Sequence, residues 1–125
     1  MNNDIFGYLN FIKAKGRPLA DINPGSSEHA LCVEDALYAI DLLEIARLGV
    51  IGGDILSEDE DGILVYALHS WGSQYYYLSW SCNRSQDESG DEYVGRSIVL
   101  AKKSIELAGK TAEELGRKCY VVLVV

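Results

Sequence analysis

Few residues of this chain could carry out catalysis or bind a metal ion. The two histidines, His29 and His69, have 39 residues between them, and neither belongs to the short repeated spacing that holds zinc. A thiol nucleophile would require Cys82 to meet His69 and a carboxylate in the folded chain, an arrangement for which the spacing provides little support. The sequence therefore predicts no catalytic residue, no metal site and no cofactor.

Two further segments resemble ligand-binding loops but lack the spacing that such loops need. Residues 52–54 (Gly-Gly-Asp) have neither the spacing nor the lysine of a phosphate-binding loop. Residues 58–61 (Glu-Asp-Glu-Asp) lack the alternate carboxylates and the distal bidentate glutamate of an EF-hand. We interpret the acidic run as the solvated tip of a β-hairpin, because Asp61-Gly62 is a strong hairpin-turn signal.

Length, composition and charge restrict the chain to a few classes of protein. Its 125 residues and 48% hydrophobic content predict one packed domain and exclude disorder. No apolar run reaches the ~20 residues that span a bilayer, and residues 1–4 lack the basic region of a secretory signal. A net charge of −8 argues against a nucleic-acid binder, because such proteins neutralise phosphates with lysine and arginine. The three cysteines are widely spaced and form no C-x-x-C pair, which argues against a disulfide framework or a zinc ribbon. These features together predict an acidic cytoplasmic domain.

The negative charge is concentrated in the first half of the chain. Residues 1–61 contain 12 acids and 4 bases, whereas residues 62–125 contain 7 of each. A one-signed surface can steer a basic partner and speed its association. The same charge can also serve solubility alone, and the composition does not separate the two roles.

Hydrophobic residues at helical spacing predict two long helices and two short ones, near residues 33–48 and 91–107, and near residues 5–14 and 112–117. Gly49 and Gly109 follow the two long helices and are expected to end them. Thr111 and Glu114 have the spacing of a capping box, which would begin the last short helix.

Branched and aromatic runs predict four strands, near residues 50–56, 63–69, 75–80 and 119–125. The first three are joined by short connections and are therefore expected to form an antiparallel meander. The last run is apolar on both faces, which is typical of a central strand. The order of elements predicts an α+β fold, in which a four-stranded, mostly antiparallel sheet carries the two long helices on one face.

Two apolar groups could belong either to the core or to a partner surface. Tyr38, Leu42 and Ile45 form a second stripe on the first long helix, which the N-terminal helix could cover or which could stay exposed. We favour the covered arrangement. Aromatic residues are also dense from Trp71 to Trp80, and alternate side chains of a strand face opposite sides. One set is therefore expected in the core, and the other is free to meet a partner.

A series of short motifs runs from residue 31 to residue 108. They are Glu34-Asp35-Ala36-Leu37, Gly52-Gly53-Asp54-Ile55, Trp80-Ser81-Cys82, Glu88-Ser89, Tyr93-Val94 and Arg96-Ser97. In order and spacing these motifs resemble the Imm40 group of immunity proteins from bacterial polymorphic-toxin and contact-dependent inhibition systems. The resemblance implies a protein that binds and neutralises a cognate toxin domain inside the cell, without catalysis of its own. It leaves the toxin unidentified.

The shared motifs themselves are consistent with roles in folding. The glycines at 52–53 fit a bulge, and Trp80 fits the core. Arg96 could pair with Glu92 one helical turn earlier. Residues 88–89 could cap the following helix or contact a partner.

An immunity protein has reason to keep its scaffold constant and to vary where it meets its toxin. We therefore expect the toxin to bind at acidic loops, namely Glu58, Asp59, Glu60 and Asp61, with Asp87 and Glu88 as a second contributor. The expected partner is a basic toxin C-terminal domain, because many such toxins are nucleases whose active sites hold phosphate. The alternative is a small enzyme or ligand-binding domain with an aromatic cleft around Trp71–Trp80. Neither a nucleic acid nor a membrane is expected as a partner, and the oligomeric state stays open.

Overall fold

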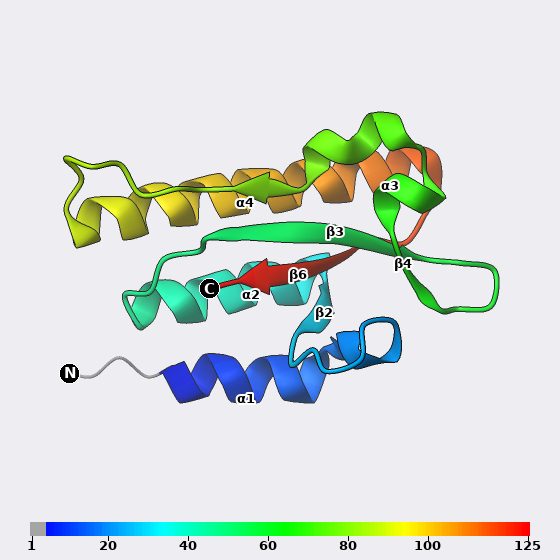
Figure 1. The fold of residues 1–125 in the computed structure, drawn as a ribbon, viewed down its shortest axis with the longest axis horizontal. Helices are drawn as coiled ribbons and strands as arrows, with labels where there is room; N and C mark the ends of the chain where they lie inside the picture. Colours follow the sequence, from blue (N-terminus) through cyan, green and yellow to red (C-terminus); the bar gives the residue numbers. More distant parts are fainter. Residues whose placement is uncertain (1–4) are drawn as a thin grey trace.

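A computed structural model describes residues 5–125, which form helices and short strands in alternation (Figure 1). The α-helices are α1 (Ile5–Lys15), α2 (Val33–Ile45), α3 (Ala67–Ser70) and α4 (Gly90–Leu115), and the 3-10 segments are η1 (Leu19–Asp21) and η2 (Ser73–Leu78). The strands are β1 (Arg17–Pro18), β2 (His29–Cys32), β3 (Gly52–Glu58), β4 (Leu64–Tyr66), β5 (Trp80–Ser81) and β6 (Tyr120–Val124).

The strands form one antiparallel sheet in the order β1-β2-β6-β3-β4, and β5 pairs with the start of β3. The prediction of a mixed fold with an antiparallel sheet is confirmed, but the sheet has six strands in the described residues instead of four. The central place predicted for the last strand is also confirmed, because Val121 of β6 lies opposite Leu31 on one side and Ile55 on the other. The strands β1 and β2 are short and were not predicted.

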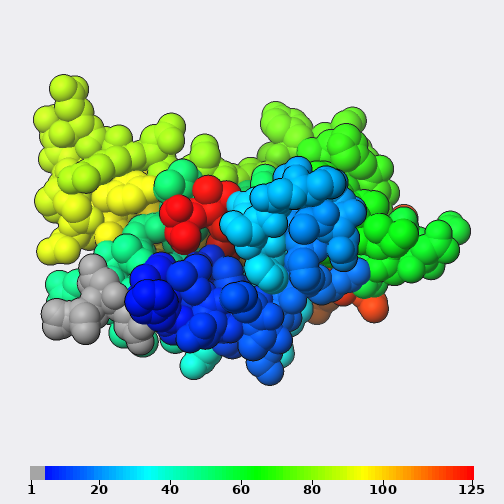
Figure 2. All heavy atoms as spheres, turned by 60° about the horizontal axis from the view of Figure 1, so that its bottom comes forward, coloured from blue at the N-terminus to red at the C-terminus, as the bar shows by residue number. Residues whose placement is uncertain are grey.

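Each face of the sheet has its own apolar cluster. Helices α1, α2 and α4 lie side by side on one face, where their buried residues pack against Ile55, Val121 and Leu123 (Figure 1). On the other face Leu19 of η1 packs with Leu56 and its sheet neighbours. Figure 2 shows the segment between α1 and β2 gathered over this side, beside the end of β6. The alternation along β6 thus divides apolar side chains between two covered faces, which explains why its sequence shows no polar alternation.

Helix α4 is longer than predicted. It begins with a capping box in which Ser89 Oγ accepts from Glu92 N, and Glu92 Oε1 accepts from Ser89 N. The expected break at Gly109 and the separate helix at 112–117 are wrong, because α4 continues to Leu115 and ends at Gly116 with φ of 66°. Thr111 does not start a helix; its hydroxyl donates to the carbonyl of Leu107 one turn earlier, at 2.8 Å.

Helix α2 is shorter than predicted. It ends at Ile45, and Arg47, with φ of 58°, is the residue that turns the chain. Gly49 has a different role from the helix-ending one that was expected. A Cβ at Gly49 would lie 2.5 Å from the ring of Tyr93, so the missing side chain lets α4 approach the chain at this point.

The prediction of a strand at 75–80 is wrong. Residues 73–78 form the 3-10 segment η2, and β5 begins only at Trp80. Trp71, Tyr75 and Leu78 pack against the core, while Tyr76 and Tyr77 are exposed. The predicted strand at 63–69 is also shortened, because β4 covers Leu64–Tyr66 and α3 follows directly.

The second apolar stripe of α2 is only partly covered. The ring of Phe11 from α1 packs against Tyr38 with ring centroids 4.8 Å apart, and Leu42 is half-buried. Ile45 at the end of the stripe is 75% exposed. Helix α1 therefore contacts the stripe but does not cover it, because Tyr38 is also 52% exposed, and the covered arrangement that we favoured is wrong for both ends of the stripe.

Candidate functional site

The predicted acidic run forms the tip of the β3–β4 hairpin, at one end of the molecule (Figure 1). Asp59 has a structural role in this turn. Its Oδ1 atom accepts from the backbone N–H groups of Asp61 and Ile63, at 2.8 and 3.0 Å, and Gly62 supplies the positive φ of 78°. Such side-chain-to-backbone bonds fix a turn locally. The tip is therefore an ordered loop in which one of the four carboxylates is already used.

Glu58 at the base of the hairpin is also engaged within the protein. Its carboxylate accepts from Arg17 and from the hydroxyl of Tyr120, at 3.0 Å for the tyrosine, and pairs with Lys118 at 3.3 Å. Arg17 in addition donates to the carbonyl of Gly62 at 2.6 Å and lies over the Tyr120 ring. Partial burial raises the pKa of Glu58, but the hydrogen bonds from Tyr120, Lys118 and Arg17 outweigh it, so the net pKa is lowered. Glu58 therefore anchors the hairpin to β1 and β6.

Glu60 and Asp61 are the available charges of the tip. Both are exposed, and within residues 5–125 neither carboxylate has a hydrogen-bond or ion-pair partner. Held by the Asp59 turn, these two side chains project from an ordered backbone. They can meet a cation of a partner without first breaking a contact.

The second predicted contributor, Asp87 with Glu88, lies in the loop before α4, at the opposite end of the molecule from the hairpin (Figure 1). Glu88 receives two hydrogen bonds from Arg96, at 2.6 and 2.7 Å, and one from the backbone N–H of Ser85 at 3.0 Å. The pairing of Arg96 with Glu92, considered from the sequence, is thus wrong. Asp87 is exposed. The structure does not bring the two predicted acidic segments together into one surface.

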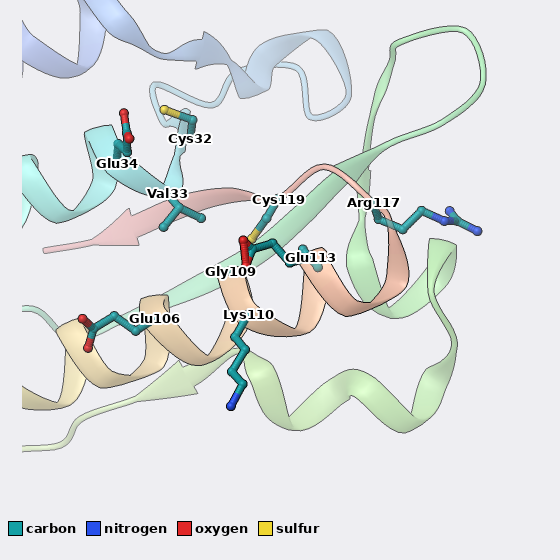
Figure 3. Close-up of a pocket in the computed structure, with 10 residues that line it drawn as sticks. Cys32, Val33, Glu34, Glu106, Gly109, Lys110, Glu113, Arg117 and Cys119 are labelled. Atoms are coloured by element: carbon teal, nitrogen blue, oxygen red, sulfur yellow. The ribbon is translucent and has the colours of Figure 1, made fainter.

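A groove that the sequence analysis missed lies between the start of α2, the end of α4 and the start of β6 (Figure 3). It is open to solvent and has a volume of about 640 Å³. Val33, Gly109, Ala112 and Cys119 contribute its apolar lining, and its charged residues are Glu34, Glu106, Lys110, Glu113 and Arg117. One signal was present in the sequence: Glu106 and Glu113 are seven residues apart, and therefore share one face of a continuous helix on either side of Gly109.

The aromatic segment does not gather around one cleft. The ring of Trp80 covers Gly53, where an added Cβ would lie 2.3 Å from it, and Trp71 packs against the core. Tyr76 and Tyr77 point outward and are 71% and 54% exposed. The two tryptophans thus belong to the scaffold, whereas the two tyrosines are surface residues.

The residues with potential for chemistry remain apart in the folded chain. Among residues 5–125, no three His, Cys, Asp or Glu side chains are grouped so as to hold a metal ion. Cys82 is buried beside the Arg96 guanidinium, whose Nη1 atom is 3.3 Å from the sulfur, and the nearest ring to His69 is that of Tyr66. In the same range, no helix is both long enough and apolar enough to cross a bilayer.

Comparison with known proteins identifies one relationship. The family model of Imm40, described as Immunity protein 40, matches residues 18–125, which includes every strand from Pro18 onward together with α2, α3 and α4. No curated protein and no solved structure matches the chain.

Proposed function

Because the chain belongs to the Immunity protein 40 family, we propose that it binds a cognate bacterial toxin domain and neutralises it by occluding a basic, nuclease-like active site. Membership of the family implies the general role of an immunity protein against a toxin. The proposal adds the mode of inhibition and the surface. It places the protein in the cytoplasm, where it would act as a binding protein without a reaction of its own.

The observation that carries the proposal is the ordered, acidic hairpin tip on a protein of net charge −8. An active site that holds phosphate is positively charged, so carboxylates can occupy it in place of nucleic acid. Glu60 and Asp61 are exposed and unpartnered among the described residues, and the Asp59 turn fixes the backbone that carries them. The backbone of the tip therefore need not be ordered on binding, which reduces the entropic cost of association.

The structure decides which hairpin residues give a clean test. Replacing Glu58 or Asp59 would remove a scaffold contact together with a charge, so the informative variant is Glu60→Ser with Asp61→Ser. Exposed substitutions of this kind usually change stability by less than ~0.5 kcal/mol. We expect the double variant to slow association with the toxin domain encoded beside this gene and to flatten the salt dependence of binding, because rim charges act mainly on the on-rate.

A matched control removes the same charge elsewhere. Asp87→Ser with Asp91→Ser also removes two negative charges, at exposed positions before and at the start of α4, at the opposite end of the molecule from the hairpin (Figure 1). The proposal expects a larger loss of on-rate at low salt for the hairpin pair than for this control. Equal effects would mean that only overall charge matters and that the toxin docks elsewhere. Failure of the wild-type protein to bind the toxin or protect cells expressing it would overturn the immunity role itself.

A further inference from the structure

We infer that the groove between α2 and α4 is a second part of the toxin-binding surface and accepts an apolar side chain of the toxin that is flanked by lysine or arginine. The inference rests on the proposed function and names the chemistry of the partner at this site. It is carried by the apolar lining of the groove, by the sign of its free charges, and by its position next to the hairpin.

The lining of the groove is apolar, and at Gly109, where α4 has no side chain, Val33 fills the space between the two helices. Val33 from α2 faces Gly109 from α4, and a Cβ at Gly109 would lie 3.3 Å from both Val33 methyl groups (Figure 3). Ala112 is buried, and Cys119 closes the groove toward β6. Burial raises the pKa of the Cys119 thiol to about 11, so this sulfur is neutral at physiological pH. A hydrocarbon side chain entering here would leave water for an apolar surface.

The free charges at the rim are negative. Glu34, Glu106 and Glu113 are exposed, and none of their carboxylates has an ion-pair partner within residues 5–125. The two cations of the groove are directed elsewhere. Arg117 donates to Ser70 Oγ at 3.1 Å, and Lys110 extends from the side of α4 that faces away from α2 (Figure 3).

The occupant follows from the combination of lining and rim. About 640 Å³ is ample for one large side chain with its neighbours, and a buried apolar anchor inside a charged rim is the usual form of an interface hot spot. A rim of three unpaired carboxylates favours a partner with lysine or arginine beside that anchor. It disfavours a second copy of this acidic chain, because two such rims would repel each other.

The groove and the hairpin can contact one partner because they share an end of the molecule. The segment that closes the groove continues into Lys118, which pairs with Glu58 at the base of the hairpin. Ser57 of β3 also donates to the Lys118 carbonyl at 2.8 Å. The loop that contains Asp87 lies at the other end (Figure 1). A toxin that binds across this end of the molecule can therefore reach both the hairpin tip and the groove on the helix face of the sheet, and it is remote from Asp87 (Figure 1).

Charge reversal at the rim provides the first test, with the neighbouring toxin domain as the probe. Glu106→Lys with Glu113→Lys is expected to weaken binding roughly tenfold or more, whereas Glu106→Gln with Glu113→Gln weakens it less. The matched control is Asp87→Lys with Asp91→Lys, which changes the net charge equally outside the groove and at the opposite end of the molecule. If the rim and control variants bind the toxin domain with equal affinity, the inference is overturned. If the wild-type protein does not bind the toxin domain at all, the proposed function is overturned instead.

A change in the lining separates an apolar occupant from simple charge attraction. Val33→Thr keeps the side-chain shape and adds a hydroxyl at the first position of α2, where threonine is tolerated. We expect weaker toxin binding at both low and high salt, because an apolar contact is not screened. Thermal unfolding would verify that the variant is folded. Unchanged affinity would exclude an apolar side chain in the groove, and dimerisation of the free protein through this face would assign the groove to a second copy.

Discussion

Glu88 and Arg96 form a two-pronged ion pair across eight residues, in which Arg96 Nε donates to Glu88 Oε2 at 2.6 Å and Arg96 Nη2 donates to Glu88 Oε1 at 2.7 Å. The same guanidinium donates to the carbonyl of Asn83 at 2.7 Å. Arg96 thus holds the loop between β5 and α4 against the first turns of α4. The pair makes this loop part of the scaffold.

The stability of the protein should fall in acid through this pair. Hydrogen bonding to Arg96 and to the Ser85 N–H lowers the pKa of Glu88 from 4.5 to about 2. The pKa of Glu88 is lower in the folded protein than in the unfolded chain. The pair therefore contributes fully to the free energy of unfolding above about pH 4.5, and this contribution is lost as the pH falls toward about 2. Urea unfolding of the wild type and of Glu88→Gln should therefore show a difference in free energy that shrinks over this interval. Asp87→Asn is the control, and a difference independent of pH would contradict the prediction.

Ser97 should be more important for stability than its small side chain indicates. Its hydroxyl accepts from the buried N–H of Val50 at 3.0 Å and donates to the carbonyl of Val94 at 3.0 Å. Ser97→Ala leaves the Val50 N–H buried without a partner, which costs about 1–3 kcal/mol. Chemical denaturation would measure the loss. Ser104→Ala, in the same helix at a half-buried position, should change stability little, and an equal loss there would refute this role for Ser97.

Gly53 should not tolerate even one added methyl group. The Cβ of an alanine would lie 2.3–2.8 Å from three ring atoms of Trp80, and β3 and the indole cannot both keep their positions. We expect Gly53→Ala to destabilise the fold by about 1–3 kcal/mol, the usual cost of overpacking. Gly95→Ala provides a control of opposite sign, because its Cβ would enter open space on helix α4. There the gain in helix propensity is about 1 kcal/mol. Thermal melts of both variants would test the pair.

The three thiols should react in a fixed order. Cys32 is exposed, whereas Cys82 is buried and Cys119 is half-buried with its pKa raised to about 11 by burial. Since the thiolate is the reactive form, Cys32 is expected to react first with a thiol reagent in the native protein. Partial burial also raises the pKa of Cys32, so its rate should be below that of a free thiol. Mass spectrometry of the labelled peptides identifies the site, and early labelling of Cys119 would contradict the burial described.

Much of the fold follows from periodicity, and the errors have identifiable causes. The segment 75–80 is rich in aromatic residues, which favours a strand, but Trp71, Tyr75 and Leu78 are spaced by four and three residues, which is helical spacing. The apolar stripe of α4 likewise continues through Ala108 to Ala112, and a glycine that packs against Val33 does not end it. In both cases local residue preferences gave way to packing against the core.

The candidate site was less predictable, because partners distant in sequence decide which carboxylates are free. Glu58 is occupied by Arg17, which is 41 residues away, and by Lys118 and Tyr120 from the far end of the chain. The sequence alone does not show that Glu58 is paired within the protein while Glu60 is free. The placement of Asp87 at the opposite end, and of Glu113 beside α2, likewise depends on how α4 crosses the sheet.

The position of β6 has a consequence for the order of events during folding. Among the described strands, β6 alone joins β2 on one side to β3 on the other, so the two halves of the sheet do not pair without it. While residues 120–124 are still being synthesised, β2 and β3 keep unpaired edges and the helices lack the strand that contributes Val121 and Leu123 to their cluster. Pairing over such sequence separations is slow relative to helix formation. A nascent chain would therefore complete the end of the molecule that we propose for toxin binding, which includes Lys118 and Cys119, only after β6 has been synthesised.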